Sequence, residues 1–198
     1  MRFMDEPTAP PPRPIAQLDS ARLHALAHPM RTRLLALLRT EGPATATALA
    51  RRLGTNSGQT SYHLRQLAEV GLVVEDAERG SARERWWRAA HEGTTWSSVD
   101  FRGDPDDQAA DSWLIGFVAR THARWMQDWI DTRDEWSDAW LDASNVSDFR
   151  LRLTPARTGA LNDQLHAVIE GYRRYEDEPG AEQVTVTLHA FPNPEPSV

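Results

Sequence analysis

Side chains with several hydrogen-bonding atoms are concentrated in one short stretch of the chain, residues 57–70. Leu64 and Leu67 stand three positions apart, so a helix over this stretch turns both of them toward a core. The same helix turns a set of polar side chains outward: Gln59, Ser61, Tyr62, Arg65 and Gln66. Glutamine pairs with adenine, arginine pairs with guanine or phosphate, and hydroxyl groups bind phosphate. This face therefore has the chemistry of a helix that reads the major groove of DNA, and we include the neighbouring Thr60 and His63 in the contact set.

Five arginines outside this helix extend the predicted contact surface. They are Arg51, Arg52, Arg79, Arg83 and Arg85. The first two lie on the preceding helix, where contact with DNA phosphates is expected. The other three flank a polar loop at residues 78–83 and are expected to contact the minor groove or the DNA backbone. The alternative is a solvated hairpin whose arginines pair only with Glu78 and Glu84.

Apolar spacing and helix-breaking residues predict the elements that position these side chains. Asp19 or Ser20 begins a first helix, and Pro29 begins a second one after a break at His28. Two further helices are expected at residues 45–53 and 57–70, each followed by a glycine. Two strands of a hairpin are then expected at residues 72–74 and 85–88. This order is that of a winged helix-turn-helix, which we place at residues 18–91.

Three segments of this region carry a resemblance to a known family: residues 26–35, 48–53 and 60–73. They are similar to the ArsR-type winged-helix repressors, and the match covers roughly 75 of the 198 residues. The family typically has Ser-His-His-Leu in its recognition helix, and this chain has Ser61-Tyr62-His63-Leu64. The resemblance implies a homodimeric repressor that binds double-stranded DNA and dimerises through a helix outside the helix-turn-helix.

The charge of the chain is divided unequally between its halves. The net charge is −7, yet residues 1–92 carry 13 arginines against 10 acidic residues. Residues 93–198 carry 9 arginines against 19 acidic residues. Attraction to DNA depends on a local basic face, so the acidic total does not exclude DNA as a partner. Residues 1–17, with five prolines among the first 14 residues, are expected to form a flexible leader.

Residues 92–198 are expected to form a dimerisation and effector region. A long helix is predicted at residues 109–143, followed by a strand (149–153), a helix (155–175) and a second strand (184–189). The fold is thus mainly α with a small β component. Aromatic side chains repeat along the long helix: Trp113, Phe117, Trp125, Trp129, Trp136 and Trp140. They indicate either core and dimer packing or a pocket for a small apolar or cationic effector.

Several function classes lack support in the sequence. The chain has no cysteine, and its only His-x-x-x-His pair, His24 and His28, is split by a helix break, so no metal site is expected. Catalytic motifs and phosphate-binding glycine loops are not found, and no cofactor is expected. No apolar run is long enough to span a membrane, and a cytoplasmic location is expected. Two alternatives to DNA binding stay open, a winged-helix module that docks another protein and an aromatic-pocket sensor of a small molecule.

Overall fold

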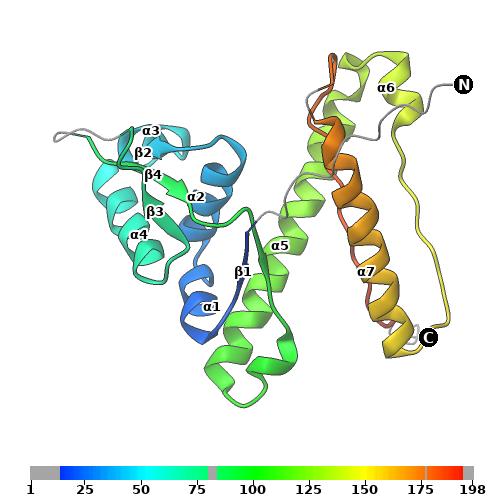
Figure 1. Ribbon diagram of the computed structural model, residues 1–198, viewed down its shortest axis with the longest axis horizontal. Coiled ribbons are helices and arrows are strands. Elements are labelled where there is room, and N and C mark those ends of the chain that lie inside the picture. Colours follow the sequence, from blue (N-terminus) through cyan, green and yellow to red (C-terminus); the bar gives the residue numbers. More distant parts are fainter. Residues whose placement is uncertain (1–13, 80–83, 177, 194–198) are drawn as a thin grey trace, which may run out of the picture. The chain divides into compact units, whose positions relative to one another are not determined.

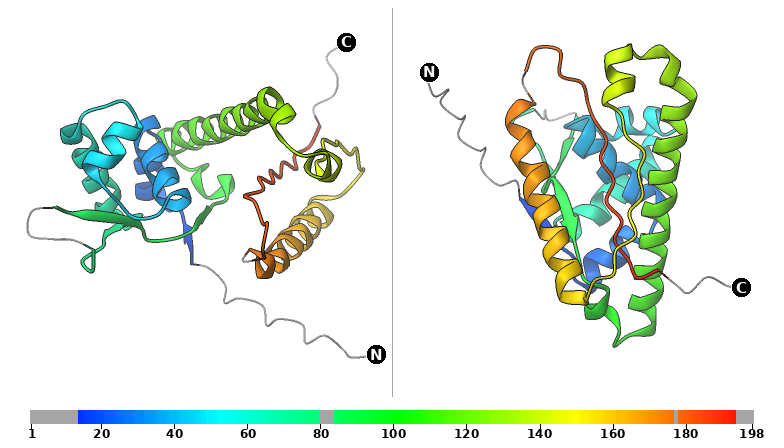
Figure 2. Two further views of the ribbon diagram at one scale, coloured as in Figure 1. Left: turned by 90° about the horizontal axis from the view of Figure 1, so that it is seen from above. Right: turned by 90° about the vertical axis from the view of Figure 1, so that its right-hand side faces the viewer.

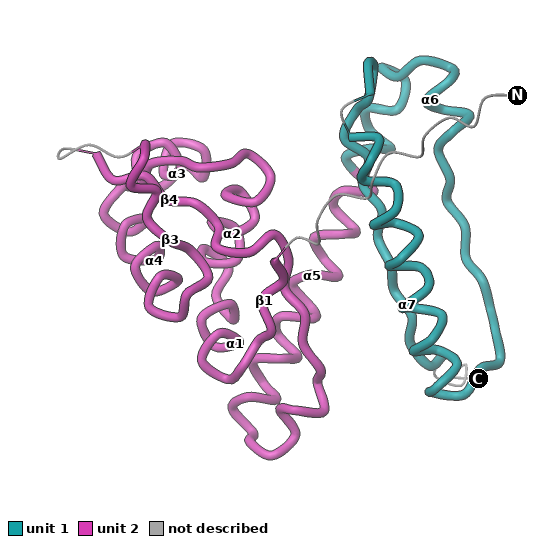
Figure 3. The backbone as a smooth tube through the Cα atoms, viewed as in Figure 1, with its two compact units in different colours: residues 1–12, 128–198 teal, residues 13–127 magenta. Residues whose placement is uncertain are grey.

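The computed structural model describes residues 14–79, 84–176 and 178–193. The chain forms two compact units (Figure 3). We call Arg13–Gln127 the winged-helix unit and the part from Asp128 onward the C-terminal unit. Mainly helical structure with a small β component confirms the predicted fold class (Figure 1).

The winged-helix unit is built from short helices and two small sheets. Its helices are α1 (Ser20–Leu26), α2 (Pro29–Thr40), α3 (Ala46–Arg52), α4 (Ser57–Glu69), the 3₁₀ turn η1 (Ser98–Phe101) and the start of α5 (Pro105–Thr132). Its strands are β1 (Ile15–Gln17), β2 (Ala44–Thr45), β3 (Val73–Glu75), β4 (Trp86–Ala89) and β5 (Gly93–Thr95). Antiparallel pairing gives a sheet of order β2-β4-β3, and β1 pairs with β5 in parallel. The β3–β4 hairpin is the predicted wing.

Side-chain caps set the starts of the four short helices. Asp19 accepts the backbone N–H of Arg22 at 2.9 Å, and His28 accepts that of Met30 at 3.1 Å. Thr45 and Asn56 cap α3 and α4 in the same way. These bonds satisfy N–H groups that have no partner inside the helix, so the predicted helix starts are confirmed.

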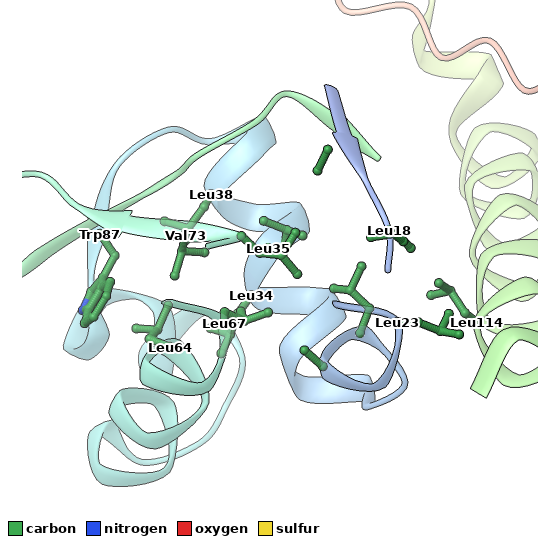
Figure 4. Close-up of a cluster of buried hydrophobic side chains, with 14 of the residues drawn as sticks. Leu18, Leu23, Leu34, Leu35, Leu38, Leu64, Leu67, Val73, Trp87 and Leu114 are labelled. Carbon is green, nitrogen blue, oxygen red and sulfur yellow. The ribbon is translucent and has the colours of Figure 1, made fainter. Parts of the chain in front are cut away.

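Figure 4 shows the leucine-rich core on which α4 lies. The leucine side chains that are entirely inaccessible to solvent come from α1, α2, α4 and the turn before β3: Leu23, Leu34, Leu64, Leu67 and Leu72. Leu114 of α5 belongs to the same core, which also includes Phe101 and Trp87. The helix that presents the predicted contact side chains is therefore fixed from behind by close packing.

Polar contacts join the outer elements to this core. The half-buried Arg39 of α2 donates to the carbonyl oxygens of His91 and Gly93, each at 3.0 Å, and desolvation lowers the pKa of its guanidinium to about 10. At the start of α5, Asp107 accepts hydrogen bonds from Ser20 at 2.7 Å and lies 2.8 Å from His24. These hydrogen bonds hold β5 and α5 against the first two helices, and nothing in the sequence pattern predicted them.

The structure changes two predicted limits of the winged-helix region. Residues 15–17 were expected to be part of the flexible leader, but they form β1 and pair with β5. Residues 1–13 lie outside the described part. The core likewise extends past residue 91, because Phe101, Ala110 and Leu114 are buried in it. The β1–β5 pair was not predicted, because only three residues on each side form it.

The predicted continuous helix at residues 109–143 is wrong at both ends. α5 begins at Pro105, where Asp104 accepts the N–H groups of Asp106 and Asp107. It ends at Thr132 and is followed by the 3₁₀ turn η2 (Arg133–Glu135) and the short helix α6 (Asp138–Ala143). Trp136 between them has an extended backbone, which interrupts the helix although no glycine or proline is present.

The rest of the C-terminal unit contains one long helix. α7 (Pro155–Tyr172) is capped by Thr154, as the sequence predicts, and ends in the 3₁₀ turn η3 (Arg173–Tyr175). The segments predicted as strands, residues 149–153 and 184–189, are extended chain that pairs with no strand in the described part of the protein. No side chain described from residue 128 onward is buried.

Candidate nucleic-acid interface

α3 and α4 form the helix-turn-helix. Gly54 ends the first helix with φ at +63°, a conformation that residues with a Cβ rarely adopt. Asn56 then starts α4 by accepting the N–H of Gln59 at 2.9 Å. Gln59 is held by Thr55, whose hydroxyl donates to the Gln59 Oε1 atom at 2.9 Å. Asn56 and Thr55, in the connection between α3 and α4, therefore fix the first helical turn of α4 and the side chain of Gln59.

The outer face of α4 carries the predicted reading side chains. Tyr62 is 53% exposed, and Gln59 and Arg65 are also exposed. Ser61 and Gln66 are half-buried. Arg65 Nε donates to the Ser61 carbonyl at 3.2 Å, and no carboxylate within the described residues pairs with its guanidinium. Arg65 is thus an exposed cation that no carboxylate of the described residues neutralises.

A shallow hollow lies between α3, α4 and the wing. Its volume is about 340 Å³. It is lined by Thr45, Ala46, Thr47, Ser61, Arg65, Glu84, Arg85 and Trp87. Arg65 from α4 and Arg85 from the wing both border it, while Glu84 adds one acidic group. Two elements that are distant in sequence therefore present cations to one open depression.

Three of the other predicted arginines differ from Arg65 in having acidic partners. Arg85 Nε lies 3.2 Å from a Glu75 oxygen, and its guanidinium lies 5.8 Å from the centre of the Trp87 ring. Arg52 pairs with Glu41 at 3.0 Å, and Arg79 pairs with Asp76 at 3.7 Å. Arg51 is exposed, and Arg83 lies outside the described residues. Within the described part of the wing, the arginines pair with Asp76 and Glu75, and not with Glu78 and Glu84 as the alternative of a solvated hairpin supposed.

Two predicted members of the contact set are placed differently from the rest. Thr60 is entirely buried, and its hydroxyl donates to the Asn56 carbonyl at 3.1 Å, so its assignment to the contact set is wrong. Its position follows from the helix itself, because Thr60 lies four residues before Leu64 on the core face. His63 is half-buried with its ring 4.5 Å from that of His28, and its Nδ1 atom is buried with no hydrogen-bond partner among the described residues.

The paired histidines predict a loss of stability in acid. Burial lowers the pKa of His28, His63 and His91, and the pKa of His63 is lowered further by His28 and Arg31. Unfolded histidines take up protons near pH 6.5, whereas these folded ones do so only at lower pH. The free energy of unfolding is therefore expected to be highest above pH 6.5 and to fall as the pH drops to 5.

Denaturant titrations at pH 7.5, 6.5, 5.5 and 5.0 measure this slope. His63→Phe removes one contributing group and should give a shallower slope. An identical slope in the wild type and His63→Phe would show that His63 is not protonated differently in the two states.

The six predicted aromatic residues are divided between the two units. Trp113 stacks on Phe117 with ring centres 5.2 Å apart and packs against the core, which favours the packing interpretation for this pair. Trp125 stacks on His122 at 5.1 Å. Trp129, Trp136 and Trp140 belong to the C-terminal unit, where Trp136 and Trp140 meet edge to face at 6.1 Å. A small-molecule pocket in this set remains a prediction.

No three His, Cys, Asp or Glu side chains in the described ranges gather as a group able to hold a metal ion. None of the described helices combines the length and the apolar character that crossing a membrane requires.

Comparison with known proteins adds independent information on residues 26–76, which match a helix-turn-helix domain family. The regulator NmtR of Mycobacterium tuberculosis is 42% identical over 71 residues. That alignment covers 32% of this chain and 58% of NmtR, so the chain spans little more than half of this relative.

Two solved structures are also similar. A possible transcriptional regulatory protein from Mycobacterium bovis is 28% identical, with 50% of this chain and 89% of that chain covered and a TM-score of 0.33. A possible transcriptional regulator for arsenical resistance is 30% identical, with 63% and 98% covered and a TM-score of 0.31. NmtR is described as a helix-turn-helix-type transcriptional regulator. Residues 26–76 therefore match a helix-turn-helix domain, and the surrounding region is similar to the transcriptional regulator NmtR.

Proposed function

We propose that this protein is a homodimeric repressor that binds specific double-stranded DNA with α4 in the major groove. The observation that carries the proposal is the division of α4 into two faces. Leu64 and Leu67 are entirely buried, while Gln59, Tyr62 and Arg65 are exposed on the other side. A helix fixed by its core face and polar on its outer face is what major-groove reading requires.

Arg65 and Gln59 are the side chains to which we assign base reading. Arg65 pairs with no carboxylate in the part of the chain that the structure describes, and it has the planar donor geometry that fits guanine. Gln59 Oε1 is already hydrogen-bonded to Thr55, which leaves its NH₂ group to donate to a base. This bond orients the amide before DNA arrives, so less conformational freedom is lost on binding.

Phosphate contacts are assigned to the groups around the hollow. Arg85 and Ser61 line it beside Arg65, and Arg51 is exposed on α3. Arg85 must give up part of its ion pair with Glu75 in order to bind a phosphate. Its net contribution to DNA affinity is therefore expected to be smaller than that of Arg65. The homodimer and the repressor role rest on the resemblance to the ArsR-type winged-helix repressors, which bind DNA as dimers.

Affinity for DNA at several salt concentrations tests the proposal. A fluorescent duplex from the region upstream of the gene should bind much more tightly than a scrambled duplex of equal length and composition. Each phosphate contact contributes a slope of about −0.9 to the plot of log affinity against log salt concentration, so six contacts per dimer give a slope near −5. Equal, salt-insensitive binding of both duplexes would contradict the proposal.

A further inference from the structure

The C-terminal unit has regular apolar patterns but no buried core among its described residues. Apolar side chains alternate with polar ones in the extended segments on both sides of α7: Phe149, Leu151 and Leu153, then Val184, Val186 and Leu188. These six side chains are between 40% and 83% exposed. α7 adds a stripe of exposed apolar residues at helical spacing, Leu165, Val168 and Tyr172. In a unit whose described residues form no buried core, such alternation indicates a surface that another molecule covers.

The size of this surface fits a protein partner. Added together, the exposed fractions of these nine side chains equal the full surface of about five apolar side chains. At roughly 100–200 Å² each, they offer on the order of 800 Å², which is what each partner buries in an interface of standard size.

The path of the chain is that of a strand-helix-strand unit. In Figures 1 and 2 the extended segments before and after α7 both run in the direction opposite to that helix. Two parallel strands and one helix are too few for a stable sheet, which normally needs three or more strands. A second strand-helix-strand unit would supply the missing strands.

We propose that the segment Val184–Leu188 pairs antiparallel with the same segment of a second copy of this chain, with Val186 opposite Val186. This pairing rests on the proposed homodimer but does not depend on DNA. It places Val184 of each copy opposite Leu188 of the other, so every apolar side chain of the segment meets an apolar one. Shifting the register by two residues in either direction loses part of this match. Thr185 then lies opposite Thr187 on the other face, a favourable cross-strand pair.

The other extended segment is unsuited to this role. An antiparallel self-pair centred on Leu151 would place Arg150 directly opposite Arg152 of the second copy, and like charges in that position are destabilising. The same arginines suit the outer edge of a four-stranded sheet, because charged side chains on an edge strand prevent further pairing. In the expected four-stranded sheet, residues 184–188 of the two copies form the two central strands. Residues 149–153 of each copy form the two edge strands.

Disulfide cross-linking without DNA tests this register, and the absence of native cysteine makes single-cysteine variants unambiguous. Directly opposite residues in an antiparallel pair have Cα atoms about 4.5–5.5 Å apart, within the range a disulfide spans. Val186→Cys should therefore give mostly covalent dimer on mild oxidation. Val184→Cys is the matched control on the same strand face. Its copies would lie about 14 Å apart, so it should stay uncross-linked, and the double variant V184C/L188C should cross-link.

The solution mass of the wild type, by light scattering, separates the ways in which the proposal can fail. A dimer in which V186C does not cross-link contradicts the strand pairing alone. Preferential cross-linking of Leu151→Cys contradicts the assignment of the central strand. A monomeric wild type contradicts both the pairing and the proposed homodimer. DNA affinity is measured separately, so loss of DNA binding in a cross-linked dimer bears only on the DNA-reading proposal.

Discussion

Arg65→Ala is expected to lower the affinity for operator DNA by at least tenfold while leaving the fold intact. Arg65 is the exposed cation of α4 that no described carboxylate neutralises, and its only described bond is to the Ser61 carbonyl of its own helix. A bidentate arginine–guanine pair contributes about 1–3 kcal/mol, and a dimer makes the contact in both half-sites. Fluorescence anisotropy titration at fixed salt concentration measures the loss.

Arg102→Ala is the matched control for this experiment. Arg102 follows η1, is exposed and belongs to the same unit, so the change removes the same charge from a surface outside α3, α4 and the wing. Its effect on affinity should stay within about twofold, because a distant exposed charge acts only through screened electrostatics. Equal losses in both variants would mean that total charge and not the α4 face determines binding.

Leu67→Ala is expected to produce the largest loss of stability, about 2–5 kcal/mol in the free energy of unfolding. Leu67 is entirely buried on the core face of α4, where the lost methyl groups leave a cavity that the surrounding leucines fill only in part. Chemical denaturation followed by circular dichroism measures the change. The variant should also lose DNA affinity, because α4 is then less firmly held.

Val99→Ala provides the comparison for stability. Val99 is 62% exposed in η1, and truncation there should change the free energy of unfolding by no more than about 0.5 kcal/mol. A loss below about 1 kcal/mol in Leu67→Ala would contradict the account of α4 as a helix positioned by its packed face.

The helix-turn-helix is predictable from sequence because its signals are local. Asp19, Pro29 and the glycines after each helix act within a few residues of the boundary that they set. The outer face of α4 follows from the three-residue spacing of Leu64 and Leu67. The same spacing places Thr60 on the core side, four residues before Leu64, so its burial is also a local feature of the helix.

Other features depend on contacts distant in sequence. β1 is three residues long, and its pairing with β5 joins positions almost 80 residues apart. The acidic partners of Arg79 and Arg85 depend on how the two wing strands align, which composition alone does not specify. The start of α5 did have a local signal: Asp104 before Pro105 is a capping residue followed by a proline suited to the first turn.

The extended segments at residues 149–153 and 184–189 show a different limit. Their alternation predicts strands, but a strand needs a partner, and within the described part of a single chain none is paired with them. A sequence can specify a strand whose sheet is completed only in an assembly. The proposed pairing at Val186 is one such completion.

Selection of bound fragments from a random DNA pool tests the central claim most directly. If α4 reads the major groove in a dimer, repeated selection should enrich an inverted repeat whose half-site centres lie about 10–10.5 base pairs, or a multiple of this, apart. Arg65→Ala, selected in parallel, should lose preference at one base pair in each half-site. A pool that stays random through successive rounds, or an identical enriched sequence in Arg65→Ala, would contradict the assignment of α4 as the reading helix.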